Sequence, residues 1–230
     1  MRVERSRAFT LVELVMVIAV IVIIATVGIP NLLSSRLTAN ETSAIATLKA
    51  ITAAQAQAMT RDAVDYDGDG QGEFLYLAEL SGTVDLRGMG QALDPAIVSV
   101  SLGNLDQSCA TKAGYFFRIY LPDSNGEGVT EDSAGGKASA ADVDPDLAEN
   151  YWVAYAWPSN VGNSGRRAFV VNQQGTLLAT ANDTQQYSGD GTDVPEYDAA
   201  YSTAQDMTST LSVNSSPGDA TDGGVWVPVN

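Results

Sequence analysis

Carboxylates at alternate positions are the first feature of this sequence whose spacing suggests chemistry. Asp65, Asp67 and Asp69 lead into a glycine turn, and Glu73 follows it. A hard cation such as Ca²⁺ needs several oxygens at about 2.3–2.6 Å, and a calcium loop supplies them from alternate residues around such a turn. The candidate calcium ligands are Asp65, Asp67, Asp69, Gln71 and Glu73.

Tyr76 marks the point at which this stretch departs from a calcium loop. It occupies the twelfth position, where a bidentate glutamate is expected. Glu79 lies too far along the chain to replace that glutamate on the same backbone path. Two interpretations therefore stay open, a Ca²⁺ site and an acidic, glycine-rich surface turn. We expect that no cofactor is strictly required.

Catalytic chemistry finds little support in the residue types. The chain has no histidine, so the usual general base and the usual nitrogen ligand for zinc are both absent. Ser164 lies in a Gly-Asn-Ser-Gly stretch, but no base is present to activate it, and we expect a turn there. Cys109 is the single cysteine and cannot form an intramolecular disulfide. We expect a protein that is not an enzyme.

The longest uncharged segment begins at Leu14 and ends at Ile29. Counted from Phe9 to Pro30, the apolar run has about the 20 residues that a helix needs to cross a bilayer. Glu13 stands near its start. An unpaired charge there costs on the order of 2–3 kcal/mol or more in lipid, so we expect this carboxylate to have a partner.

Residues 8–14 read AFTLVEL, and a leader of eight residues with three arginines and one glutamate ends at Ala8. The short basic leader, the small residue before Phe9, the carboxylate four residues later and the apolar run resemble the processing signal of type IV prepilins and type II secretion pseudopilins. One departure is Ala8, because glycine is usual in the family.

The resemblance implies that a prepilin peptidase cleaves between Ala8 and Phe9, that the new α-amino group is methylated, and that subunits polymerise through the N-terminal helix. The amine of one subunit would then meet Glu13 of its neighbour, and removing one member of such a buried pair leaves an uncompensated charge. Glu13 and Pro30 are the expected assembly residues. The expected partners are copies of the chain, other pilin-like subunits, the peptidase and the inner-membrane assembly machinery.

Other functions share parts of this pattern. A secretory signal peptide has an apolar core of about 7–15 residues and a small-residue cleavage site after it, whereas this run is longer and continues into Pro30-Asn31-Leu32-Leu33. A buried core helix would rarely be apolar all round, and a plain anchor explains neither Glu13 nor the leader. A type IV pilus subunit is the first hypothesis, and a type II secretion or competence pseudopilin shares its signal. From another class, the alternative is a membrane-anchored, calcium-dependent binding module that never polymerises.

Charge is divided unevenly along the chain. Residues 1–61 carry six basic and three acidic side chains, whereas residues 62–230 carry six basic and 25 acidic ones. The Arg-bearing leader is expected to stay cytoplasmic while the acidic head is exported. Nucleic acid binding by the head is not expected, because phosphate neutralisation needs clustered Lys or Arg. We expect the bacterial inner membrane before assembly, then a cell-surface or periplasm-spanning filament.

The expected fold is α+β, with one long kinked helix packed on a small antiparallel sheet of three to four strands. Helical spacing after Pro30 is shown by Ile45, Leu48, Ile51, Gln55 and Met59. Strands are predicted at 114–121, 151–157, 167–172 and 176–180, and a further one at 97–102. The predicted segments are a leader (1–8), a transmembrane or filament-core helix (9–30), its amphipathic half (31–61), a β-rich head (62–182) and a Ser/Thr/Gly/Asp-rich tail (183–230), partly disordered or a surface loop.

Overall fold

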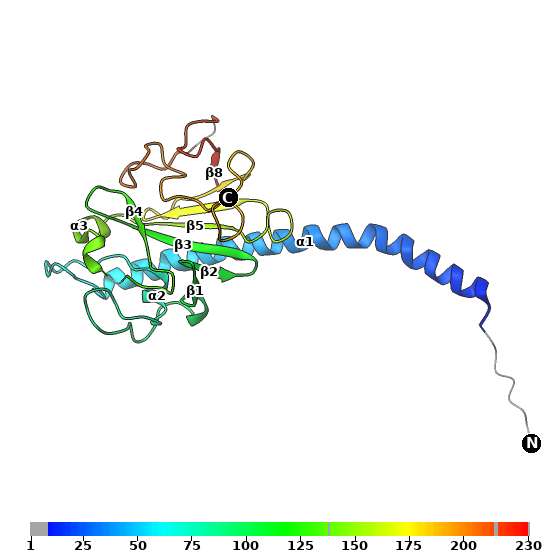
Figure 1. Cartoon of the computed structure of the whole chain (residues 1–230), viewed down its shortest axis with the longest axis horizontal. Coiled ribbons are helices and arrows are strands. Elements are labelled where there is room, and N and C mark those ends of the chain that lie inside the picture. The colour runs from blue at the N-terminus through cyan, green and yellow to red at the C-terminus, as the bar shows by residue number, and fades with distance from the viewer. Residues whose placement is uncertain (1–8, 138, 214–215, 230) are drawn as a thin grey trace, which may run out of the picture.

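One helix organises the molecule. The computed structural model of the chain describes residues 9–137, 139–213 and 216–229. In it, α1 (Leu11–Thr60) is a continuous helix of 50 residues, whose C-terminal half lies in the head and whose N-terminal half projects from it (Figure 1). The long helix predicted from the sequence is confirmed, with ends one or two residues inside the predicted ones. The leader, including Ala8, lies outside the described residues.

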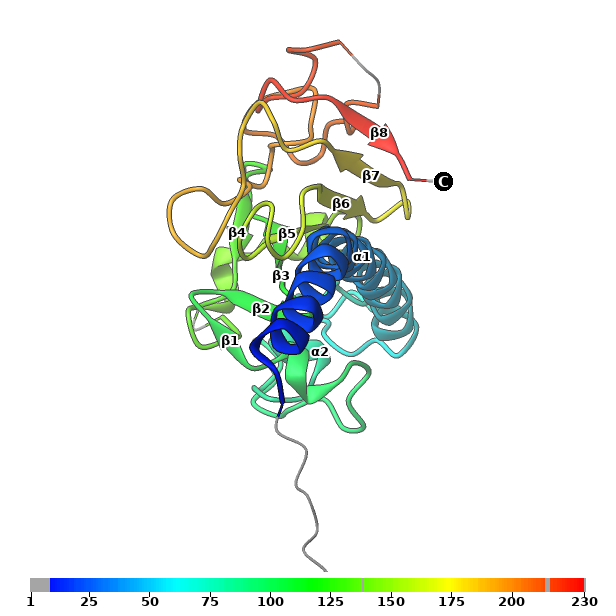
Figure 2. The same ribbon diagram turned by 90° about the vertical axis from the view of Figure 1, so that its right-hand side faces the viewer.

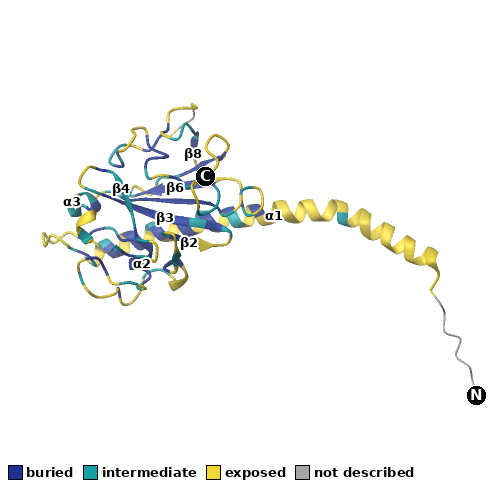
Figure 3. Ribbon diagram, viewed as in Figure 1, coloured by how far each residue is buried: buried dark blue, intermediate teal, exposed yellow. Residues whose placement is uncertain are grey.

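The projecting half of α1 passes through Pro30 without a break. Proline has no N–H to give to the carbonyl of Thr26, and its ring crowds that turn. The helix continues, and its N-terminal half bends away from the axis of the other half (Figure 1). Apolar side chains cover this half on all sides, and nearly all of it is exposed (Figure 3).

The second half of α1 carries the apolar stripe that the sequence predicts. Leu48 and Ile51 are fully buried, and Ile45 packs partly buried against the same core. Gln55 replaces an apolar residue in this stripe, and its amide is satisfied. Its Nε2 donates to the carbonyl of Leu75 at 2.7 Å and its Oε1 accepts from the Leu75 N–H at 2.9 Å.

The head contains an antiparallel sheet of eight strands, so the prediction of three to four strands is wrong. The order is β1-β2-β3-β5-β6-β7-β8, with β4 paired to one end of β3. Figure 2 shows the sheet beside α1. The strands are β1 (Leu105–Asp106), β2 (Cys109–Lys112), β3 (Tyr115–Pro122), β4 (Gly128–Thr130), β5 (Val153–Pro158), β6 (Ala168–Asn172), β7 (Leu177–Thr180) and β8 (Trp226–Pro228).

The strands predicted at 114–121, 151–157, 167–172 and 176–180 correspond to β3, β5, β6 and β7. The four strands that were not predicted have only two to four residues each. Such short strands cannot show an alternation of apolar and polar residues. The strand predicted at 97–102 is wrong, because that segment contains a 3₁₀ turn, η1 (Val100–Leu102). The remaining short helices are α2 (Leu77–Leu80), η2 (Ala140–Asp142) and α3 (Pro145–Ala148).

Both faces of the sheet are covered. On β3, Tyr115, Phe117 and Ile119 belong to the core shared with α1, whereas Tyr120 belongs to a second core on the other face. Strands buried on both faces read as continuous apolar runs rather than as alternating ones. This explains why the central strands were the easiest to recognise.

The second core is completed by the tail after β7. We expected this segment to bury little surface, but the aromatic side chains Tyr187, Tyr201 and Trp226 are almost completely buried in it. The backbone of the tail is mostly irregular, as expected, until β8 pairs with β7. Widely spaced aromatic residues therefore hold a polar segment onto the outer face of the sheet.

Candidate assembly and cation-binding sites

Glu13 lies in the first turn of α1 and is paired with Thr10. The Thr10 hydroxyl accepts from the Glu13 N–H at 3.2 Å, and Glu13 Oε2 accepts from the Thr10 N–H at 3.0 Å and from its hydroxyl at 2.9 Å. This reciprocal arrangement is a capping box, which satisfies backbone donors at a helix start. Glu13 therefore has a partner within its own chain, one residue away from Phe9.

The apolar half of α1 is the second part of the candidate assembly site. Phe9 and Leu11 are each 78% exposed, and the exposed large apolar side chains continue to Leu33. Within the described residues, α1 is the one helix long and apolar enough to cross a membrane. This helix suggests a membrane anchor or a signal sequence. An all-round apolar surface of this size needs lipid or protein to cover it.

The acidic loop brings together three of its five predicted ligands. Carboxylate oxygens of Asp65, Asp67 and Asp69 lie within 4.8 Å of one another. Asp65 also shapes the loop, because its Oδ1 accepts from the Gly68 N–H at 2.8 Å. The Gln71 side chain donates through its amide nitrogen to Asp69 at 3.2 Å. At this contact Gln71 offers no oxygen to a cation.

Two acidic residues that the spacing did not identify approach this loop, one from α3 and one from the residue just after it. Asp146 and Glu149 form a second group with Asp67, again with oxygens within 4.8 Å. One oxygen of Glu149 is inaccessible to solvent and has no hydrogen-bond partner among the described residues. Burial, followed by repulsion from Asp69 and Asp67, raises the pKa of Glu149. Carboxylates gathered in this way could hold a cation, as the calcium interpretation requires.

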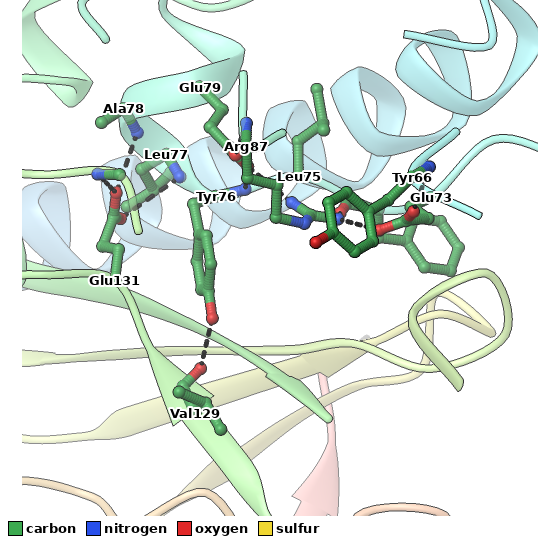
Figure 4. Close-up of polar contacts among 12 residues, drawn as sticks. Tyr66, Glu73, Leu75, Tyr76, Leu77, Ala78, Glu79, Arg87, Val129 and Glu131 are labelled. Carbon is green, nitrogen blue, oxygen red and sulfur yellow. Dashed lines mark hydrogen bonds and ion pairs between the residues drawn. The ribbon is translucent and has the colours of Figure 1, made fainter. Parts of the chain in front are cut away.

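Glu73, the fifth predicted ligand, points elsewhere. Its Oε2 lies 2.8 Å from the guanidinium of Arg87, and its Oε1 accepts from the Tyr66 N–H at 2.9 Å (Figure 4). The Glu73 side chain is only 2% exposed. The structure therefore separates Glu73 from the acidic loop and commits it to a buried ion pair.

Arg87 is the centre of that buried network. It also binds Glu79 Oε2 at 2.7 Å and the carbonyl of Phe74 at 2.6 Å. Burial alone would lower the pKa of Arg87, but the carboxylates of Glu79 and Glu73 outweigh it and leave the pKa raised. The cluster ties α2 to the segment before it. Because all three charges are paired with one another, we assign the cluster a structural role.

Glu131 forms a separate buried contact with α2. Its carboxylate accepts backbone N–H groups of Leu77 at 3.3 Å, Ala78 at 3.2 Å and Gly136 at 3.1 Å (Figure 4). Burial raises the pKa of Glu131 to about 8, against the lowering effect of these N–H donors. No motif in the sequence marks Glu131, because its three donors are backbone groups.

Ser164 and Cys109 fit structural positions. The Ser164 hydroxyl accepts from the Asn160 N–H and donates to the Asn160 carbonyl, each at 3.0 Å, which closes the expected turn. Cys109 is buried, and its sulfur accepts from Arg118 at 3.1 Å. Burial raises the pKa of the Cys109 thiol, which disfavours the reactive thiolate.

Comparison with known proteins gives one family. No curated protein and no solved structure matches the chain. A family described as "Protein of unknown function (DUF2950)" matches residues 24–189, and no pilin family is matched. The matched region begins within the apolar half of α1 and includes the head as far as β7. The chain therefore belongs to the DUF2950 family of proteins of unknown function.

Proposed function

We propose that the chain is the structural subunit of a type IV pilus-like filament. A prepilin peptidase cleaves it before Phe9, the new amino group is methylated, and subunits polymerise through α1. The observation that carries the proposal is the pilin-like signal directly joined to a helix half that is exposed and apolar on all sides. The family match names no activity, so the proposal rests on these residues.

The division of α1 supports this function. Its second half is anchored in the head core through Leu48 and Ile51, while its first half is exposed among the residues that the structure describes. In a filament, the projecting halves of neighbouring copies would pack together and remove their apolar surface from water. Burial of that surface would contribute about 25 cal/mol per Å².

The capping box favours a second candidate, a membrane-anchored binding module that does not polymerise. Because Thr10 and Glu13 satisfy each other, a glutamate at this position has a role even in an isolated helix. In this case the acidic loop, with Asp67 in both carboxylate groups, would be the functional site.

A mass measurement on the membrane-extracted protein distinguishes the two candidates. The filament hypothesis predicts loss of residues 1–8 and gain of one methyl group on Phe9. An intact Met1 in cells that contain a prepilin peptidase would support the anchored module instead.

Variants of the capping box then separate its two roles. Glu13→Ala removes the carboxylate half of the capping box together with the proposed partner of a neighbour's amine, whereas Thr10→Ala removes only the hydroxyl half and keeps the carboxylate. We expect Glu13→Ala to abolish filaments and Thr10→Ala to retain them, as judged by electron microscopy of sheared cell-surface fractions. Equal loss in both variants would assign Glu13 to capping and not to assembly.

A further inference from the structure

The apolar half of α1 has about the length that a bilayer requires. Leu11 to Leu33 is a stretch of 23 residues, about 34 Å at 1.5 Å per residue. The hydrocarbon core of a bilayer is about 30 Å thick and each headgroup layer adds roughly 5–7 Å. If α1 spans the membrane, Ser34 and the turn after it lie at the level of the lipid headgroups.

Four basic side chains lie near the point where the helix leaves the head, and we call them the basic collar: Arg36, Lys112, Arg166 and Arg167. All four are exposed. Figure 2 views the head from this end, with α1 coming toward the viewer. Lys112 ends β2, and Gly114 in the following turn lies beside Asn40, because a Cβ on Gly114 would be 3.2 Å from the Asn40 amide nitrogen.

A hollow of about 240 Å³ lies on one side of the helix within the collar. Ser34, Thr38 and Glu41 line it from α1, and Arg166 and Arg167 line it from the loop before β6. At about 100° per residue, Arg36 lies on the opposite side of the helix. Basic groups therefore stand on both sides of α1 at one depth.

Only one of the four collar charges is paired within the described part of the chain. Glu41 neutralises Arg167, with 2.8 Å between its Oε2 and the Arg167 Nε. Among the residues that the structure describes, Arg36, Lys112 and Arg166 take part in no ion pair. The rest of the head is strongly acidic, since residues 62–230 hold 25 acidic and only six basic side chains. The collar therefore presents the opposite sign from the head to the membrane surface.

We propose that the basic collar binds the phosphate of anionic phospholipid headgroups, which hold the acidic head at a fixed height above the membrane. Arg166, beside the hydroxyl of Ser34 in the hollow, contacts one headgroup, and Arg36 contacts another across the helix. The charge complementarity is specific to this end, because an acidic head would otherwise be repelled by an anionic surface. The inference rests on the membrane insertion that the proposed function assumes, and not on polymerisation.

The test is a lipid titration of the full chain in detergent micelles, in which native mass spectrometry measures the bound lipid. Phosphatidylglycerol and phosphatidylcholine with the same acyl chains are added separately, and the ratio of their affinities is measured. The variants are Arg36→Gln, Arg166→Gln and the double variant. Lys49→Gln is the matched control, because Lys49 is exposed on the same helix about 20 Å beyond Arg36.

We expect a preference of at least tenfold for phosphatidylglycerol in the unaltered chain. Each Arg→Gln change should lower this preference about fivefold, and Lys49→Gln should leave it unchanged. No preference in the unaltered chain, or an equal effect of Lys49→Gln and Arg166→Gln, would overturn the proposal. If Arg166→Gln abolished self-association but left the lipid preference unchanged, the proposal would be overturned, and the partner of the collar would be a second copy of the chain.

Extraction of membranes at alkaline pH separates failure of this inference from failure of the proposed function. A chain that is released from the membrane contradicts the anchored helix, and with it both proposals. A chain that stays in the membrane but shows no preference for the anionic lipid contradicts the collar alone.

Discussion

Glu41 and Arg167 join α1 to β6 at the point where the helix leaves the head. The Arg167 Nε donates to Glu41 Oε2 at 2.8 Å, and Glu41 Oε1 accepts from the backbone N–H groups of Arg166 at 3.1 Å and Arg167 at 3.3 Å. Glu41 is 9% exposed. A single carboxylate therefore ties α1 to the segment before β6 through three hydrogen bonds.

Glu41→Ala should destabilise the head by about 1–3 kcal/mol, because two backbone N–H groups and the Arg167 guanidinium lose their acceptor. The measurement is thermal unfolding of the full chain in detergent, followed by tryptophan fluorescence. Arg166→Ala is the control, since its backbone N–H stays in place and its side chain is exposed. A melting temperature for Glu41→Ala equal to that of the control would show that the contact adds no stability.

Arg87→Ala should have a larger effect, about 3–5 kcal/mol, because Glu73 and Glu79 would remain buried without a counterion. Chemical unfolding of the full chain in detergent measures it, with Lys49→Ala as an exposed control. The triple variant Arg87→Met, Glu73→Gln, Glu79→Gln should recover part of the lost stability. A loss below about 1 kcal/mol for Arg87→Ala would mean that water enters the cluster.

Glu131 should make stability depend on pH. Its pKa is raised to about 8 in the fold, whereas an unfolded glutamate titrates near about 4.3. The folded state thus holds an extra proton between these values, so this stabilisation is complete below about pH 4 and is lost as the pH rises through about 8. Melting temperatures from pH 5 to 9 should fall less steeply in Glu131→Gln than in the unaltered chain. Glu127→Gln, just before β4 where Glu131 is just after it, is the control, and parallel slopes in all three proteins would contradict the prediction.

The calcium interpretation predicts that CaCl₂ raises the melting temperature and that a chelator reverses the effect. Saturation at 100 times the dissociation constant would add about 2.7 kcal/mol. Asp67→Asn should remove the response, because Asp67 belongs to both carboxylate groups, and the exposed Asp106→Asn should keep it. An unchanged melting temperature on adding calcium would assign the loop to the alternative, an acidic surface turn.

The parts of the fold that were predictable from sequence are those with a long local repeat. The stripe through Leu48 and Ile51 locates the helix face that packs on the sheet, and the apolar run around Tyr155 locates a strand buried on both sides. Short strands such as β1 have too few residues to show a repeat. The aromatic residue Tyr201 was assigned to a polar tail, because its burial depends on a sheet formed much earlier in the chain.

The candidate cation site was only partly predictable for a similar reason. Spacing located Asp65, Asp67 and Asp69 because these ligands come from one loop. Glu149 comes close to Asp67 only through the placement of α3, which ends just before it, and no local pattern encodes that placement. Glu73 fits the spacing but forms an ion pair with Arg87 instead. Whether Glu73 faces the loop or the Arg87 guanidinium depends on the tertiary structure, which local spacing does not show.

The two outer strands of the sheet limit how copies of this protein can associate. β1 has two residues, and β8 has three and ends at Pro228, which offers no backbone donor. Edges this short give a neighbouring chain little main chain to hydrogen-bond, and they discourage growth of the sheet from one molecule into the next. The heads are thus protected against amyloid-like aggregation even when many are crowded together.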